Sequence, residues 1–316
     1  LVDRPSRTRP VPEGAVRRLS PRRATAIGGC LALVVTAVAG LAPATSAQAT
    51  EAETEVSVSV PAGWMLTWSD EFDGPAGAPP DPEVWGYDLG DGSANGLTGW
   101  GNDELQWYTD EPENVALDGD GHLVIAAAEA TGGLECYYGP CQYTSARLLT
   151  KDRFTFQHGY LEARLQVPPG FGLWPAFWLL GSNIEAVSWP TSGEIDVMEY
   201  VGRRPNEFFG TLHGPGYSGS SGISGRFDLG RPASDDFHTV ALQWEPDRLA
   251  WFLDGQLYHE VTSADVEPNE WVFEQPFFML LNVAVGGNLG GPIFPDTVFP
   301  ARMLVDYVRL YQPEAT

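Results

Sequence analysis

Residues 158–167 read HGYLEARLQV, and their pattern decides the fold class. Apolar side chains recur at every second position, at Leu161, Ala163, Leu165 and Val167, and the positions between them carry polar or larger side chains. Because successive side chains of a strand point to opposite faces, this alternation predicts a strand with one face in a protein core.

Strand signals continue on the C-terminal side of this stretch. Residues 237–261 predict three strands, which are joined by turns at residues 246–247 (Pro-Asp) and 254–255 (Asp-Gly). Residues 277–285 (FFMLLNVAV) and 303–311 (MLVDYVRLY) predict two more. Many short antiparallel strands in one domain of about 250 residues predict an all-β fold, a sandwich of two sheets of the jelly-roll type.

The first 49 residues have the pattern of a secretory signal peptide. Seven arginines precede an apolar run over residues 24–42, and residues 47–49 (Ala-Gln-Ala) form a small-x-small cleavage site. An uncleaved membrane anchor is the alternative, because the run is just long enough to span a bilayer. An arginine pair in the basic stretch leaves the twin-arginine export route open. We therefore expect a secreted, extracellular protein with a signal peptide over residues 1–49, a linker over 50–62 and one β domain over 63–316.

Composition narrows the range of partners. The formal net charge of −24 at pH 7 argues against nucleic acid and anionic membrane surfaces as partners. Neutral and cationic partners remain, and we expect a monomer with no membrane contact after signal cleavage. The eleven tryptophans either fill the core or offer flat surfaces on which sugar rings stack.

Two cysteines remain once the signal peptide is removed. Cys136 and Cys141 lie at the ends of CYYGPC, around a Gly-Pro pair. In the oxidising compartment that a secreted protein enters, this spacing predicts a small loop disulfide. Half of a metal site is the alternative.

Residues 193–200 (GEIDVMEY) place three carboxylates within six residues. In a regular strand Glu194 and Asp196 share a face and Glu199 points the other way. A helix would not gather all three on one face either. One extra residue in the strand, a β-bulge with Met198 as the added residue, would return Glu199 to the other two. A solvated acidic edge and a calcium site are the alternatives.

Carboxylates gathered in this way suit the hydrolysis of glycosides. A retaining enzyme needs one carboxylate as nucleophile and one as general acid/base, about 5–5.5 Å apart. Asp196 would lie beside Glu194 and share a hydrogen bond or a proton with it. Such coupling spreads the titration of the group and keeps one member protonated near neutral pH.

Residues 194–199, which follow WPTSG, resemble the active-site strand of glycoside hydrolase family 16 in its bulged form, E-x-D-x-x-E. That form is seen in laminarinase-like endo-1,3-β-glucanases of secreted bacterial type, whereas lichenase relatives carry E-x-D-x-E. The resemblance covers nearly the whole chain after the signal peptide. It includes WSDEFDG, GNDELQWYT, GTLHGPGYSG, FFMLLNVAVGGNLGG and VDYVRLYQ.

The resemblance implies a jelly-roll sandwich, similar to concanavalin, with a substrate cleft on its concave face. It implies a secreted endo-β-glucanase that cleaves internal bonds of β-glucan by a retaining double displacement, with β-1,3 bonds as the main target and β-1,3-1,4 bonds as an additional one. Glu194 matches the nucleophile, Glu199 the acid/base and Asp196 the residue that assists the nucleophile, and no cofactor enters the catalysis. The alternatives are a transglycosylase or galactan hydrolase of the same family and a non-catalytic, lectin-like module.

Further positions match family motifs that line the cleft. They are Asn102, Glu104, Arg147, Trp174, Trp178, Trp189, His213 and Asn282. The three tryptophans either stack on glucose rings or fill the core. Arg147 orients a catalytic carboxylate or binds a sugar hydroxyl, unless it forms an ordinary surface ion pair. His213 is expected beside the acid/base or in a structural role, and Asn282 needs a sugar or backbone partner.

Asp306 is a carboxylate within an otherwise apolar strand pattern. In a regular strand it would share a face with Val308 and Leu310, where it would need a compensating charge. The resemblance implies a structural calcium ion at Asp306, with carbonyls from Glu71 and Gly121, and oxygen ligands suit this ion. A hydrogen-bonded aspartate without a metal is the alternative.

Overall fold

The computed structural model describes residues 60–314. The expected signal peptide and the linker up to residue 59 therefore lie outside the described residues, and both stay predictions. Within the described part of the chain, no helix has the length and apolar character needed to cross a bilayer.

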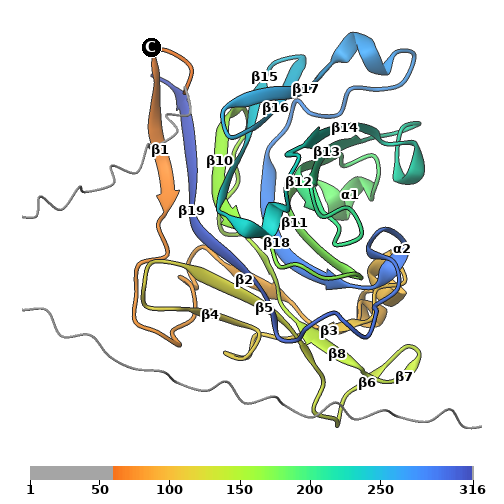
Figure 1. The fold of residues 1–316 in the computed structure, drawn as a ribbon. Coiled ribbons are helices and arrows are strands. Elements are labelled where there is room, and N and C mark those ends of the chain that lie inside the picture. The colour runs from red at the N-terminus through yellow and green to blue at the C-terminus, as the bar shows by residue number, and fades with distance from the viewer. Residues whose placement is uncertain (1–59, 315–316) are drawn as a thin grey trace, which may run out of the picture. The chain divides into compact units, whose positions relative to one another are not determined.

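Strands dominate the fold, and most of them belong to two sheets (Figure 1). The ten-stranded sheet has the order β17-β16-β15-β10-β19-β5-β8-β3, with β1 paired to β19 and β4 paired to β5. Its strands are β1 (Trp64–Asp70), β3 (Gln106–Tyr108), β4 (Val115–Leu117), β5 (Leu123–Glu129), β8 (Tyr143–Ser145), β10 (Gly159–Gln166), β15 (His238–Glu245), β16 (Arg248–Leu253), β17 (Gln256–Thr262) and β19 (Ala301–Pro313).

The seven-stranded sheet has the order β14-β13-β12-β11-β18-β9-β2. Its strands are β2 (Gly86–Asp88), β9 (Arg147–Leu149), β11 (Leu173–Gly181), β12 (Glu194–Tyr200), β13 (Glu207–His213), β14 (Ile223–Asp228) and β18 (Phe277–Val285). A separate hairpin joins β6 (Glu135–Cys136) to β7 (Gly139–Pro140). Apart from the parallel pair β3–β8, the strand pairs of the described residues are antiparallel.

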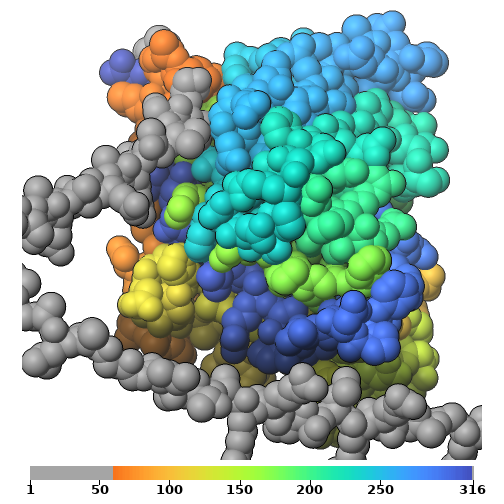
Figure 2. Space-filling model, in the orientation of Figure 1, coloured from red at the N-terminus to blue at the C-terminus, as the bar shows by residue number. Residues whose placement is uncertain are grey.

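The helices of the described residues are single turns in the connections. They are α1 (Ile184–Val187), α2 (Gly287–Gly290) and the 3₁₀ turns η1 (Ser93–Asn95), η2 (Thr98–Gly101), η3 (Gly219–Ser221), η4 (Ala233–Asp235) and η5 (Ser263–Val266). The two sheets share one hydrophobic core. They come together at one edge, where β14 lies beside β17 (Figure 1), and the segments that carry these two strands adjoin on the surface in Figure 2. This is the jelly-roll sandwich that the sequence predicts.

The alternating stretch forms β10, as predicted. Its apolar set, from Leu161 to Val167, is fully buried in the core between the sheets. The other face is covered as well, since Tyr160 and Glu162 are also buried and Tyr307 donates its hydroxyl to Glu162 at 2.9 Å. Pairing with β15 and β19 places β10 in the middle of its sheet.

The three predicted strands of residues 237–261 are β15, β16 and β17. Both predicted turns are present, and the second one has Asp254 and Gly255 at positive φ, 47° and 74°. Two positive φ values suit the tight hairpins that match the twist of the flanking strands. The Asp254 carboxylate also accepts from the backbone N–H of Thr239 at 2.9 Å, which closes the turn onto β15.

The strand face predicted for the Asp306 side chain is wrong. In the pairing of β19 with β10, the partners pass from Tyr307 directly to Val305, so Asp306 is the extra residue of a bulge. The bulge shifts the side-chain alternation, because Val305 and Val308 both lie in the core. Asp306 therefore does not share a face with Val308.

Two of the three residues expected at the calcium site have an arginine partner. Arg164 donates to the Asp306 carboxylate, and Arg309 forms two hydrogen bonds to the Glu71 carboxylate at 3.0 and 2.7 Å. The charge of Asp306 is thus balanced by a guanidinium group, which fits the hydrogen-bonded alternative better than it fits a cation ligand. Calcium binding that includes Gly121 stays an untested prediction.

Candidate active site

The carboxylate stretch forms β12, between β11 and β13, and it contains the predicted bulge. The pairing with β13 jumps between Asp196 and Glu199. Val197 and Met198 therefore lie together opposite the single residue Gly210 of β13. Two residues against one is the defining count of a β-bulge.

The detail of the bulge differs from the prediction. On the β11 side the pairing passes from Met198 directly to Asp196, so the residue without a partner is Val197 and not Met198. Both Val197 and Met198 are buried in the core. Because two consecutive side chains take the core face, the next residue, Glu199, returns to the face of Asp196.

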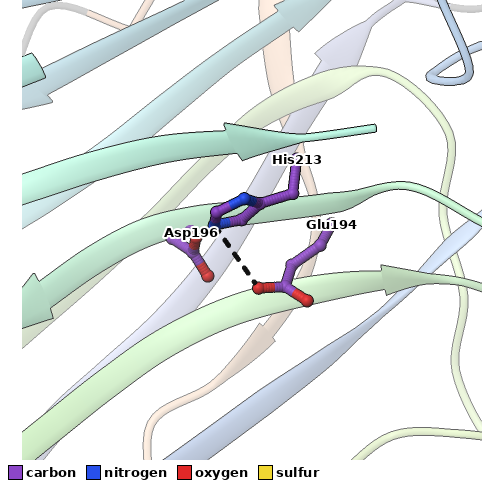
Figure 3. A group of neighbouring side chains, drawn as sticks. All are labelled: Glu194, Asp196 and His213. Carbon is purple, nitrogen blue, oxygen red and sulfur yellow. Dashed lines mark ion pairs between the residues drawn. The ribbon is translucent and has the colours of Figure 1, made fainter. Parts of the chain in front are cut away.

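Each carboxylate of this face has its own neighbours. Glu199 accepts from the indole N–H of Trp174 at 3.0 Å and from the hydroxyl of Thr211 at 3.2 Å. His213 lies between the other two, with its Nε2 atom 3.2 Å from Asp196 Oδ2 and 3.8 Å from Glu194 Oε1 (Figure 3). The Asp196 Oδ2 atom is buried without a hydrogen bond from a described residue.

Burial dominates the electrostatics of the three acids. Desolvation raises the pKa of Glu194, Asp196 and Glu199 to about 8 each. For both glutamates this value already includes two smaller effects, since the nearby charge of Asp196 raises the pKa and His213 lowers it. Interacting acids of this kind titrate as one group. The cluster therefore retains protons at neutral pH, as an acid catalyst requires.

Exposure distinguishes the members of the cluster. The Glu194 side chain retains 19% of its accessible surface, against 6% for Asp196. Glu199 is buried, and its two oxygens are both held by hydrogen bonds. Glu194 is thus the carboxylate that an incoming molecule reaches first.

His213 lies within the carboxylate cluster. Its ion-pair partners are Asp196 and Glu194, so it stands beside the expected nucleophile, and it also lowers the pKa of Glu199. The ring of Trp189 lies 6.3 Å from the His213 ring, and this tryptophan is 45% exposed. An exposed indole next to the carboxylates offers a flat surface for a sugar ring.

Trp174 and Trp178 share one face of β11 and are half-buried, so neither one only fills the core. Their indole N–H groups point to different partners, since Trp174 donates to Glu199 and Trp178 donates to the Asn282 side chain at 2.8 Å. Each ring is therefore fixed in orientation by a hydrogen bond.

The Asn282 side chain binds two other side chains and not the backbone, and its expected contact with a sugar stays a prediction. Its side-chain oxygen accepts from Trp178, and its nitrogen donates to the Tyr108 hydroxyl at 3.1 Å. Tyr108 in turn donates to Glu104 at 3.2 Å. A buried polar network thus runs from the tryptophan on β11 across β18 to β3.

Glu104 is buried at the end of this network. Besides Tyr108, it accepts from Gln106 at 2.6 Å and from Asn102 at 3.3 Å. Desolvation raises the pKa of Glu104, and the nearby Arg147 charge lowers it. The expected substrate-binding roles of Asn102 and Glu104 stay predictions, because in this arrangement the two side chains bind each other.

Arg147 contacts no catalytic carboxylate. Its guanidinium carbon lies 4.6 Å from the ring centre of Trp100 and 4.7 Å from that of Trp178, so the group is held between two indoles. Its Nε atom lies 3.0 Å from Asp88 Oδ2. The side chain is largely buried, unlike an ordinary surface ion pair, and it connects β9 to η2, β2 and β11.

Three comparisons relate the sequence and the fold of this chain to known proteins. The family model described as "Glycosyl hydrolases family 16" matches residues 100–308. The chain belongs to this family.

Two curated relatives and one solved structure match most of this family 16 chain and most of their own length. A beta-glucanase of Rhodothermus marinus is 40% identical over 258 residues, which cover 79% of this chain and 85% of that protein. A glucan endo-1,3-beta-glucosidase of Cryptopygus antarcticus is 41% identical and covers 72% of this chain and 83% of its own. The catalytic domain of a laminarinase from Thermotoga petrophila superposes with a TM-score of 0.75 at 44% identity, over 80% of this chain and 99% of that one.

The sequence analysis did not single out several residues that the structure places at this family 16 site. Thr211 was missed, although it lies two residues before His213 and so on the same face of β13. Trp100, Tyr108 and Asp88 were missed because their contacts join segments far apart in the chain.

One group of the described residues has the geometry of a metal site. Ligand atoms of Glu194, Asp196 and His213 all lie within 4.8 Å of one another. Glu194 is the expected nucleophile and Asp196 the residue expected to assist it, and a bound cation would occupy the oxygens of both. Catalysis therefore stays the expected role of this group.

Proposed function

We propose that this family 16 chain is an endo-β-1,3-glucanase that hydrolyses β-glucan with retention of configuration. The observation that carries the proposal is the bulge of β12, which brings Glu194, Asp196 and Glu199 to one face beside two oriented tryptophans. The names of the relatives, a beta-glucanase, an endo-1,3-beta-glucosidase and a laminarinase, support the substrate class.

In the first step Glu194 attacks the anomeric carbon of the bound glucan. Glu199 donates its proton to the leaving glycosidic oxygen as the bond breaks, and a glycosyl ester of Glu194 forms. The high pKa of Glu199, raised by burial to about 8, keeps this proton available at neutral pH. Glu194 must be ionised to attack, and although burial raises its pKa to about 8 as well, His213 at 3.8 Å lowers that pKa and so favours the charged form.

In the second step Glu199 is a base. It takes a proton from a water molecule, the water oxygen attacks the anomeric carbon, and the ester bond to Glu194 breaks. Asp196 stays beside His213 and carries the second proton of the cluster, which limits the repulsion between the acids. The product keeps the β configuration, because the carbon is inverted twice.

The sugar chain is held by aromatic faces beside the cluster. Trp174, Trp178 and Trp189 provide them, and the first two are fixed by hydrogen bonds to Glu199 and Asn282. The partly exposed state of all three leaves ring surface for stacking.

We also propose that the protein is secreted and acts as a monomer. The signal-peptide pattern of residues 1–49 supports export. The disulfide between Cys136 and Cys141 fits an oxidising compartment. Detection of the protein in culture medium, with an N-terminus near residue 50, would test the first part, and light scattering would test the second.

The function is tested by product analysis on laminarin, curdlan, barley glucan and agarose. We expect release of reducing ends from laminarin and curdlan, with β-anomers formed first by NMR. Glu194→Gln and Glu199→Gln are expected to abolish nearly all hydrolysis while the circular dichroism spectrum stays unchanged. A Glu194→Gln variant that hydrolyses laminarin at the wild-type rate would overturn the residue assignment, and cleavage of agarose alone would overturn the substrate class.

A further inference from the structure

The carbonyl at the start of the bulge is held from the opposite sheet. Trp251 lies on β16 of the ten-stranded sheet, fully buried, and its indole Nε1 donates to the backbone oxygen of Asp196 at 2.8 Å. This contact crosses the core between the two sheets. A bulge interrupts the regular ladder of its strand, so a buried carbonyl beside it needs a partner from elsewhere.

The strand opposite the bulge leaves room for this indole. Gly210 is the one residue that faces both Val197 and Met198. A Cβ atom at position 210 would lie 2.4 Å from Cδ1 of Trp251 and 2.7 Å from the Tyr258 hydroxyl. The glycine and the tryptophan therefore complement each other, since any larger residue at 210 would displace the indole.

We propose that Trp251 is a positioning residue for catalysis, which fixes the bulge of β12 and thereby the direction of Glu199. The proposal rests on the proposed function. In a strand, the loss of one residue from the register moves the following side chains to the opposite face. The face of Glu199 is thus decided by the bulge, and the bulge is tied to the other sheet through the Asp196 carbonyl.

The test compares two tryptophans with the same kind of bond. Trp244 on β15 is also fully buried, and its Nε1 donates to the backbone oxygen of Phe273 at 3.1 Å, outside β12. Trp251→Phe and Trp244→Phe each remove one indole donor from one buried carbonyl and keep an aromatic ring. The two variants are expected to lower Tm by similar amounts.

The two variants are expected to differ in activity. A misdirected Glu199 protonates the leaving oxygen poorly, and this matters most for a sugar leaving group. We expect Trp251→Phe to lower kcat on laminarin about 10- to 100-fold, with a much smaller loss of the first chemical step on a dinitrophenyl β-laminaribioside, whose leaving group needs no proton. Trp244→Phe is expected to change kcat on both substrates by about twofold or less.

Gly210→Ala provides a second route to the same prediction if Trp251→Phe does not fold. It keeps the indole donor but pushes it from its place, and the same substrate-dependent loss is expected. Equal losses on both substrates, or a Trp251→Phe variant that matches Trp244→Phe, would overturn the positioning role. A wild-type protein that does not hydrolyse laminarin would instead contradict the proposed function, so the two failures are distinguishable.

Discussion

Thr211 donates its hydroxyl to Oε2 of Glu199 at 3.2 Å, from the strand next to the carboxylate strand. The Thr211 oxygen lies 2.9 Å from the hydroxyl of Ser224, so a short chain of hydroxyls leads to the acid from β14. A hydrogen bond to the charged form stabilises it, and this bond accordingly lowers the pKa of Glu199, against the larger effect of burial.

Thr211→Val therefore raises the pKa of Glu199 further. The basic limb of the pH profile of kcat/KM is expected to move upward by about 0.5–1 pH unit, because one neutral hydrogen bond contributes about 0.5–1.5 kcal/mol. Thr109→Val removes a comparable hydroxyl, which donates to Asn114 at 2.7 Å away from the cluster. That control should leave the profile unchanged, and an unshifted profile in both variants would contradict the role of Thr211.

The buried acids predict a stability that depends on pH. The pKa of Glu199 is raised from 4.5 to about 8 by burial, so between these values the folded protein binds more protons than the unfolded chain. The free energy of unfolding then falls as pH rises through this window.

Glu199→Gln removes this titration. The variant is expected to match the wild type near about pH 4 and to exceed its free energy of unfolding by about 1–4 kcal/mol near about pH 9. Urea unfolding at a series of pH values measures the difference. The exposed Glu83→Gln is the control and should give a flat difference. A Glu199→Gln difference that is equally flat would show that the glutamate is not desolvated.

Local patterns were sufficient for much of the fold. The alternation of residues 158–167 predicted β10, and the Asp-Gly pair predicted the turn between β16 and β17, because both signals depend only on neighbours in the chain. The order of strands in the sheets does not follow from such signals. The face predicted for Asp306 was wrong for a related reason. A bulge in β19, opposite Arg164 and Leu165 of β10, shifts the alternation of side chains along β19.

The site was predictable where spacing alone sets the geometry. Strand parity placed Glu194 beside Asp196, and the misfit of Glu199 pointed to the bulge. The choice of Val197 over Met198 as the extra residue depends on pairing with β11, which spacing does not reveal. The partners of Arg147 and Asn282 likewise come from strands that are neighbours only in the folded sheet.

The disulfide hairpin supports the segment that carries Trp100. Tyr138, between the two cysteines, donates its hydroxyl to the Leu105 carbonyl at 2.6 Å, and the backbone N–H of Tyr137 donates to Asp91 at 2.7 Å. Replacing both Cys136 and Cys141 by serine is expected to lower the free energy of unfolding by about 2 kcal/mol, because the closed loop is short.

Urea unfolding with and without dithiothreitol measures this effect. The wild type should lose stability when reduced, and the double serine variant should not respond to the reductant. A wild type that is equally stable in both conditions would show that the hairpin is held by its hydrogen bonds alone.

The stacking of Arg147 between Trp100 and Trp178 predicts a difference between arginine and lysine. Lysine at position 147 keeps the positive charge for Asp88, but it has no flat group to fill the space between two indoles. Each cation–π contact contributes about 0.5–2 kcal/mol, so Arg147→Lys is expected to loosen Trp178 and to raise KM for laminarin about 3- to 30-fold.

The kcat of Arg147→Lys should stay within about threefold, because Arg147 touches none of the three acids. Arg164→Lys is the matched control. Arg164 also lies 4.6 Å over an aromatic ring, Phe237, and also pairs with an aspartate, Asp306, but it belongs to the ten-stranded sheet. We expect no change in KM for this control, and a rise of KM in both variants would trace the effect to lost stability and not to the tryptophan beside the cluster.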